Sequence, residues 1–295
     1  MSGLPHGYVL KGRYKILSTL GQGSFSSVYL ASDSQWKGNL VALKAISTEH
    51  FSEQEYMQLN AHFLQEAAFL MTLKHPGLPR VVEFFAEGAS YFLALQWIGG
   101  KNLEEVLVER GRLEFEEVLG WGIELCAILD YLHSREPYPV LLGDLKPSNI
   151  ILRYDNHVSV VDFGVARQVI PEQHRDFSLV SPGFSPPEQY QSFNVGTSGD
   201  VYSLGATLYW LLTGVDLARL RFAIPPLRQH RSDASEDLER VLARCLEFEA
   251  RRRYPEIRHV DEELKRILQQ LNADAGEFSA GDILSALYKS KKKEL

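Results

Sequence analysis

Short apolar runs separated by turn residues fill roughly the first hundred residues of the chain. Runs of this length, rich in β-branched and aromatic residues and bounded by glycine, asparagine or serine, are typical of strands joined by tight turns. The predicted strands are RYKILSTL, SSVYLASD and LVALKAI, followed by those at 80–88 and 90–97. The pattern therefore predicts antiparallel strands in the first third of the chain.

One helix is expected among these strands. Ser52 followed by Glu55 matches a capping box, in which each residue satisfies a backbone amide of the other. Apolar side chains then recur at helical spacing, which predicts a helix over about 53–73. The segment 75–77, His-Pro-Gly, ends it.

Beyond the glycine pair at 99–100, which is typical of a hinge, the pattern becomes helical. The predicted helices cover 116–134, 200–214, 236–249 and 261–271. One pair of strand-like runs interrupts them at 150–164. The sequence thus predicts an α+β fold with a small β-rich amino-terminal lobe containing one helix and a larger α-helical carboxy-terminal lobe.

Composition narrows the functional class. The chain has 295 residues, 45% of them hydrophobic and 23% charged, as in soluble globular proteins of one large domain or two lobes. A formal net charge of −7 argues against nucleic-acid binding, because no domain-wide basic surface is available. Cys126 and Cys245 lie inside apolar helical patterns, which favours buried thiols in a reducing compartment, and we expect a cytoplasmic protein. The first residues lack a signal-peptide pattern, and 200–214 is shorter than the roughly 20 residues that span a bilayer.

The hairpin predicted at 150–164 brings two polar residues together. If Asp155 and Asn156 form a two-residue turn, counting outward from it places Asn149 opposite Asp162. A carboxylate and an amide oxygen are hard ligands that suit Mg²⁺. An ordinary surface loop would explain each residue singly, but not their convergence.

A second candidate site lies in the first lobe. The run GQGSFSSV at 21–28 could bring backbone amides to a phosphate, although alone it could equally be an ordinary hairpin. The next strand places Ala42 and Lys44 on one face. Because Lys44 lies within an apolar run, it needs a partner, and Glu66 on the predicted helix offers a carboxylate.

Taken together and in this order, these segments resemble the signature set of protein kinases from about Tyr14 to Leu271. The matching motifs are GQGSFSSV at 21–28, VALK at 41–44, DLKPSN at 144–149, DFG at 162–164 and PPE at 186–188. Within the Hanks-type serine/threonine protein kinases, the sequence most resembles bacterial members. The resemblance implies a bilobal kinase-like fold.

The resemblance also implies domain limits. An N-terminal extension would cover 1–13, an ATP-binding lobe 14–98, and a catalytic and substrate-binding lobe 99–271. A tail at 272–295 could form a short helix.

The resemblance assigns catalytic roles residue by residue. Lys44, paired with Glu66, would hold the α- and β-phosphates of ATP. Asp144 would accept the proton of the substrate hydroxyl, and Lys146 would steady the γ-phosphoryl group. The other implied nucleotide contacts are Gly21, Gln22, Gly23 and Ser24 in the loop, Val28 and Ala42 around the adenine, the gatekeeper Leu95, and Gln96, Trp97 and Ile98 in the hinge.

Metal, substrate and frame residues are implied in the same way. Asn149 and Asp162 would hold Mg²⁺, while Ser181 and Gly183 would receive the hydroxyl-bearing substrate. The implied structural residues are Asp200, which would fix the backbone of the catalytic loop, Glu188 paired with Arg253, and an apolar stack of Leu70, Val81, Leu142 and Phe163.

Three positions depart from the family pattern. Ser26 replaces the third glycine of the loop, and Leu142 replaces a histidine in the apolar stack. Gly143 replaces the arginine that in many kinases pairs with a phosphorylated residue of the activation loop. Without that guanidinium, a phosphate on Ser178 or Ser181 meets no obvious cation in the catalytic loop, so we predict activity that does not depend on activation-loop phosphorylation.

The resulting hypothesis is a serine/threonine protein kinase that uses ATP and Mg²⁺ to modify hydroxyls of protein substrates. The altered residues 142–143 motivate an alternative, a pseudokinase scaffold that binds nucleotide without transfer. A small-molecule kinase of the aminoglycoside-phosphotransferase type is disfavoured, because 181–190 resembles a segment that docks a polypeptide. We expect no nucleic-acid partner, and membrane association only through the basic tail or further chain; the oligomeric state stays open.

Overall fold

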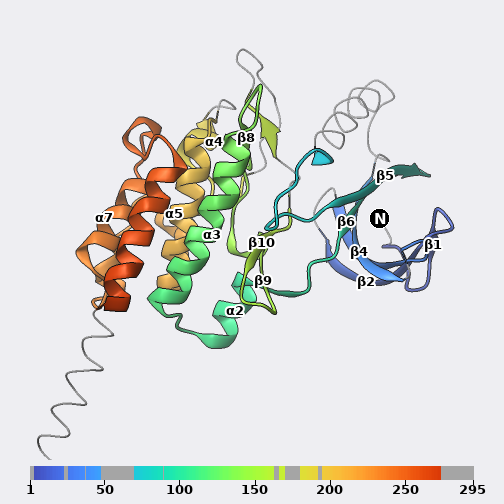
Figure 1. Cartoon of the computed structure of the whole chain (residues 1–295), viewed down its shortest axis with the longest axis horizontal. Helices are drawn as coiled ribbons and strands as arrows, with labels where there is room; N and C mark the ends of the chain where they lie inside the picture. Colours follow the sequence, from blue (N-terminus) through green and yellow to red (C-terminus); the bar gives the residue numbers. More distant parts are fainter. Residues whose placement is uncertain are drawn as a thin grey trace, which may run out of the picture. The chain divides into compact units, whose positions relative to one another are not determined.

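The computed structural model describes residues 3–22, 26–36, 38–47, 70–88, 90–162, 166–169, 180–191 and 195–273 (Figure 1). The chain divides into two compact units. The first unit comprises Met1–Gly100 with Ser159–Val161, and the second comprises Lys101–Val158 with Asp162–Leu295.

The first unit is built on a six-stranded sheet with the order β1-β2-β3-β4-β6-β5. Its strands are β1 (Val9–Leu10), β2 (Tyr14–Gln22), β3 (Ser26–Asp33), β4 (Asn39–Ser47), β5 (Val81–Glu87) and β6 (Ser90–Gln96). The five predicted strands are therefore present and antiparallel. The two-residue strand β1 was missed, because so short a pairing leaves no periodic signal.

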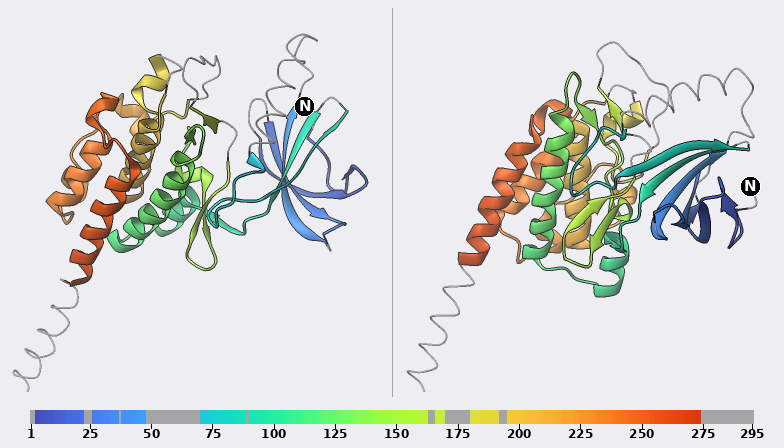
Figure 2. Two further views of the ribbon diagram at one scale, coloured as in Figure 1. Left: turned by 45° about the horizontal axis from the view of Figure 1, so that its top comes forward. Right: turned by 45° about the vertical axis from the view of Figure 1, so that its right-hand side comes forward.

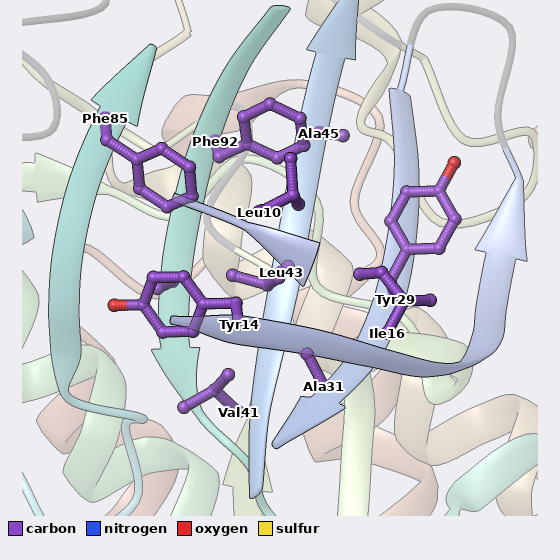
Figure 3. Close-up of a cluster of buried hydrophobic side chains, with 11 residues drawn as sticks. Leu10, Tyr14, Ile16, Tyr29, Ala31, Val41, Leu43, Ala45, Phe85 and Phe92 are labelled. Carbon is purple, nitrogen blue, oxygen red and sulfur yellow. The ribbon is translucent and has the colours of Figure 1, made fainter. Parts of the chain in front are cut away.

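One face of this sheet carries the apolar core (Figure 3). Along β4, Val41 and Leu43 are fully buried while the alternate residue Ala42 is only half-buried, as expected when successive side chains point to opposite faces. Phe85 of β5 stacks on Tyr14 and on Phe92, with ring centroids 5.4 and 5.1 Å apart. The core thus ties the first strands of the chain to the last strands of the sheet.

A cluster of charged side chains around Arg13 connects strands of the same unit. Arg13 binds the fully buried carboxylate of Asp33 through two hydrogen bonds of 2.6 and 2.7 Å. A third nitrogen of Arg13 binds Glu83 at 2.8 Å, and Glu83 also accepts from the hydroxyl of Tyr14 and pairs with Lys11. The Arg13 guanidinium holds the pKa of Asp33 below its usual value.

The second unit is mainly helical. Its helices are α2 (Leu103–Arg110), α3 (Phe115–His133), α4 (Pro187–Gln191), α5 (Ser198–Thr213), α6 (Leu227–His230), α7 (Glu236–Cys245) and a helix over 257–273. The structure also contains two small sheets. In one, β9 (Ile150–Arg153) lies between β7 (Gly100–Asn102) and β10 (Val158–Val160); in the other, β8 (Val140–Leu141) pairs with β11 (Arg167–Gln168). The four predicted helices are present, whereas α2, α4 and α6 were missed.

Two of these differences have local causes. Helix α2 starts at a capping box of Asn102 and Glu105 that the apolar pattern did not reveal. Helix α7 was predicted to reach residue 249 but ends at Cys245. Arg253 donates hydrogen bonds to the carbonyls of Glu247 and Phe248, which a longer helix would use as acceptors.

Close contacts at glycines hold the helices together. In Figures 1 and 2, α3 and α5 lie side by side with the helix over 257–273. A Cβ atom at Gly122 of α3 would lie 3.2 Å from Leu208 of α5 and 3.1 Å from Leu264. A Cβ atom at Gly205 would lie 2.5 Å from Cys245 of α7. Glycine therefore allows α5 to approach its neighbours on two sides.

The cysteine prediction is confirmed: Cys126 and Cys245 are both buried and free. Burial raises the pKa of the Cys245 thiol to about 12. Within the described residues, no helix is long and apolar enough to cross a membrane.

The β9–β10 hairpin corrects the predicted two-residue turn. The amide of Arg153 binds the carbonyl of His157, and the amide of Asn156 binds the carbonyl of Arg153, so the loop has three residues. Asn156 has a φ of 64°, the left-handed conformation that asparagine tolerates best after glycine. The pairing is shifted by one residue, so Asp162 does not lie directly opposite Asn149. Both residues still lie at the end of the hairpin away from its loop.

Candidate active site

The loop between β8 and β9 places Asp144 and Lys146 within the second unit. It contains a short 3₁₀ turn, Pro147–Asn149, directly before β9. Asn149 is buried and donates to both the backbone and the carboxylate of Asp144, at 2.9 and 3.0 Å. Lys146 approaches the same carboxylate, with 2.8 Å between nitrogen and oxygen. The three polar residues that the sequence singled out in this loop therefore form one cluster.

Ser181 completes the cluster from a distant part of the chain. Its hydroxyl donates to Asp144 at 2.5 Å and accepts from Lys146 at 2.7 Å. A serine hydroxyl thus lies between a carboxylate that can take its proton and a cation that can stabilise negative charge.

Asp200 fixes the backbone that precedes Asp144. It is fully buried in the first turn of α5 and accepts from the amides of Leu142 and Gly143, both at 2.9 Å. His133, the last residue of α3, lies 2.9 Å from the same carboxylate. The carboxylate of Asp200 therefore joins two helices to the catalytic loop.

Gly143 takes a backbone conformation that favours glycine, with a φ of 79°. Its amide binds Asp200, and its carbonyl lies 3.4 Å from the side-chain nitrogen of the buried Gln189. Gly143 is thus held on both sides by the fold. An arginine here would have to adopt a strained φ.

Glu188 and Arg253 form the predicted pair. Two hydrogen bonds of 2.7 Å join them, and the Arg253 side chain is fully buried. Arg253 also donates to the carbonyls of Ser198, Glu247 and Phe248. One guanidinium therefore links α4 to the start of α5 and to the segment after α7.

In the first unit, strand register gathers four of the predicted nucleotide contacts. Lys44 lies opposite Val28 on β3, and Ala42 lies opposite Leu95 on β6. These residues alternate with the buried core positions of their strands, so they share the face of the sheet opposite the core. A small residue, two apolar residues and a lysine on one face suit an adenine ring beside phosphates.

The remaining loop and hinge residues lie at strand ends. Gly21 and Gln22 are exposed at the end of β2, and Gly21 pairs with Val28. Gln96 ends β6 and donates to the carbonyl of Arg80, while the amide of Trp97 donates to Leu40; Ile98 follows and is half-buried.

The residues of the predicted apolar stack belong to different units, so each is described within its own unit. Leu70 is buried and Val81 half-buried in the first unit, whereas Leu142 is buried in the second. Residues Gly23, Ser24, Glu66 and Phe163 and most of the helix predicted at 53–73 lie outside the described residues, as do Ser178 and nearly all of the tail.

The residues at the implied Mg²⁺ position fit the metal by their chemistry. Both hydrogen bonds of Asn149 to Asp144 use its amide nitrogen, which leaves the amide oxygen as the available ligand. Asp162 is half-buried two residues after β10 and supplies a carboxylate. Hard oxygen ligands of this kind, completed by phosphate oxygens, are typical of Mg²⁺ sites.

Sequence reasoning missed two residues of the site. His133 lies at a helix end, where a basic residue needs no further explanation, and Gln189 follows a motif that ended one residue earlier. No spacing rule connects either residue to the catalytic loop, because their contacts depend on long-range packing.

Comparison with known proteins agrees with the fold. The family model described as protein kinase domain matches residues 14–276. The serine/threonine-protein kinase PknA of Nostoc sp. is 32% identical over 87% of this chain and 48% of its own length. A probable serine/threonine-protein kinase of Clostridium acetobutylicum is 26% identical over 92% of this chain and 42% of its own length. The chain therefore spans less than half the length of these relatives.

A solved structure has a similar fold. The kinase domain of PknI from Mycobacterium tuberculosis has a TM-score of 0.70 and 24% sequence identity, and the match covers 90% of this chain and 99% of that domain. At this identity the likeness shows the fold.

Proposed function

Since the chain belongs to the protein kinase family, we propose that it transfers the γ-phosphoryl group of ATP to serine or threonine hydroxyls of protein substrates. The observation that carries this proposal is the Ser181 hydroxyl, which donates to Asp144 at 2.5 Å beside Lys146. This is the contact that an acceptor hydroxyl must make to pass its proton to Asp144.

The other residues position and neutralise the phosphates. Mg²⁺, when bound by Asn149 and Asp162, supplies charge neutralisation for the transferring group. Lys44 would hold the α- and β-phosphates, and Lys146 would approach the γ-phosphoryl group. Transfer of a phosphoryl group needs positioning and charge more than covalent chemistry, and these side chains supply both.

We further propose that this activity needs no phosphate on the activation loop. The backbone at Gly143 is already held by Asp200 and Gln189, so no phosphate-bound arginine is required to order it. Phosphatase-treated protein and a Ser178→Ala variant should keep most of the activity towards a peptide. A loss of most activity in both would refute this independence.

The decisive experiment is incubation of the chain with labelled ATP, Mg²⁺ and a generic serine/threonine substrate. We expect label on the substrate at a rate at least about 100-fold above that of an Asp144→Asn control, the lower end of the effect of a general base. Both proteins should bind ATP comparably, since Asp144 acts on the hydroxyl. Nucleotide binding without transfer above the control would instead favour the pseudokinase scaffold.

A further inference from the structure

An aromatic ledge lies on the surface of the second unit. We use this name for Tyr190 of α4, Phe222 and Phe248, whose rings meet edge to face with centroids 5.4 and 5.8 Å from Phe222. Tyr190 is 47% exposed and Phe248 52% exposed. The buried Tyr202 packs under Phe222 at 6.5 Å. Three large rings that share one partly exposed cluster form a surface suited to a partner's apolar side chain.

A turn with an unfavourable backbone conformation holds Phe222 in its place in the ledge. Arg221 and Phe222 have φ values of 48° and 70°, and the amide of Ala223 binds the carbonyl of Leu220 at 2.9 Å. Two successive left-handed residues form a turn that glycine and asparagine normally occupy, at a cost of about 1 kcal/mol or more per residue. Strain of this kind is retained where the surrounding structure requires a particular side-chain position.

The same turn points to the charge of the partner. Arg221 is exposed, and no ion pair joins it to another of the described residues. Arg219, two residues earlier in the 3₁₀ turn Leu217–Leu220, is also exposed, and among the described residues its ion-pair partner is the exposed Asp216. Two accessible guanidinium groups beside aromatic rings, in a chain of net charge −7, favour a segment that carries carboxylates.

The ledge is continuous with the substrate loop. A Cβ atom at Gly183 would lie 2.8 Å from the amide nitrogen of Ala218 and 3.0 Å from Leu217, so the loop packs on the 3₁₀ turn that leads to Arg221. Along the same segment, Gly183 lies seven residues before Tyr190 of the ledge. Ser181, two residues earlier, contacts Asp144. A polypeptide whose hydroxyl reaches Asp144 therefore has the ledge within reach of its flanking residues.

We propose that the aromatic ledge and Arg221 select substrates in which an acidic residue and an apolar residue flank the acceptor serine or threonine. This inference rests on the proposed kinase activity and adds to it the chemistry of the preferred substrate. Arg221 would bind the carboxylate, and the ledge would pack against the apolar side chain.

The test is a peptide library with a central serine and one flanking position fixed at a time, phosphorylated by the unmodified chain and by Arg221→Glu. We expect the unmodified chain to favour aspartate or glutamate at one flanking position or more, and Arg221→Glu to lose that preference. With the best acidic peptide, KM should rise roughly tenfold at unchanged kcat, since the reversed charge repels the carboxylate.

Two further variants control the result. Arg240→Glu makes the same change of charge on α7, outside the ledge, and should keep the acidic preference. Phe248→Ser should weaken selection of apolar residues without altering that for acidic ones. An acidic preference that survives in Arg221→Glu, or selection of basic residues by the unmodified chain, would overturn the inference about substrate choice but not the proposed kinase activity. Transfer to no peptide at all would refute the kinase activity and the inference with it.

Discussion

Lys44 and Asp144 are held in place by different means. Lys44 lies in a regular strand, where its direction follows from alternation with the buried Val41 and Leu43 and from pairing with β3. Asp144 lies in an irregular loop, where its place depends on hydrogen bonds from Asn149 and on the backbone contacts of Asp200. The first arrangement tolerates local loss of packing, whereas the second depends on single buried polar groups.

Asp200→Ala should break the second arrangement with the largest effect. It removes two charge-assisted hydrogen bonds to the loop backbone, each worth roughly 1.5–3 kcal/mol, so we expect kcat to fall by roughly 100-fold or more. The measurement is kcat for a peptide at a temperature where the variant is folded. As a control from the sheet, Leu43→Val should lower stability by about 1 kcal/mol and leave the kcat of the folded protein unchanged. Equal losses of kcat in the two variants would contradict the comparison.

Glu188→Ala tests the buried ion pair with Arg253, which links α4 to the start of α5. It leaves the fully buried Arg253 guanidinium without its carboxylate, which should cost roughly 3–5 kcal/mol in the free energy of unfolding. Denaturant titration measures this change. The double variant Glu188→Ala/Arg253→Met removes the uncompensated charge, so its loss should be smaller than the sum of the two single losses. Additive losses would mean that the two side chains do not act as a pair.

Asp33→Asn makes the corresponding change in the first unit. Arg13 keeps Glu83 as a second partner and is partly exposed, so we expect a smaller loss of about 2 kcal/mol. Because Arg13 lowers the folded-state pKa of Asp33, its contribution is present above the unfolded pKa of about 3.9 and is lost as pH falls through the lower folded value. The difference between the two proteins should therefore shrink below about pH 4. A difference that grows there would contradict the assigned cause.

Gly143→Ala should have a modest effect. Its φ of 79° makes any side chain unfavourable by about 1 kcal/mol, and we expect a small loss of stability with a few-fold loss of kcat. Gly120→Ala is the matched control, because a Cβ atom there meets nothing within 4 Å in the middle of α3 and should be neutral or stabilising. Thermal unfolding of both variants gives the comparison.

The two thiols should show the smallest effect. Burial raises the pKa of both Cys126 and Cys245, so neither forms the reactive thiolate near neutral pH. The native protein should not react with a thiol reagent, whereas denatured protein should show two thiols. Rapid labelling of the native chain would contradict this expectation, and the labelled cysteine would show whether α3 or α7 opens.

The difference between a regular strand and an irregular loop also decides which features could be predicted from the sequence. The shared face of Ala42 and Lys44 followed from strand alternation, which is a local property of the chain, whereas Leu95 was expected beside them only from the resemblance to kinases. The contacts of His133 and Gln189 join residues far apart in sequence, and no periodicity encodes them. The predicted turn at Asp155–Asn156 was wrong by one residue, because turn residues alone do not distinguish a two-residue loop from a three-residue loop with Asn156 in the left-handed region.

Helix α5 makes the activity of the chain depend on the order in which the second unit folds. Most of its residues are buried on every side, and glycines at 122 and 205 bring α3 and α7 into contact with it. Such a helix has no amphipathic face and is unstable until its neighbours have docked. Since α5 carries Asp200, the loop around Asp144 can be ordered only after the second unit has assembled. A nascent or partly unfolded chain would therefore be inactive, and activity would report complete assembly of this unit.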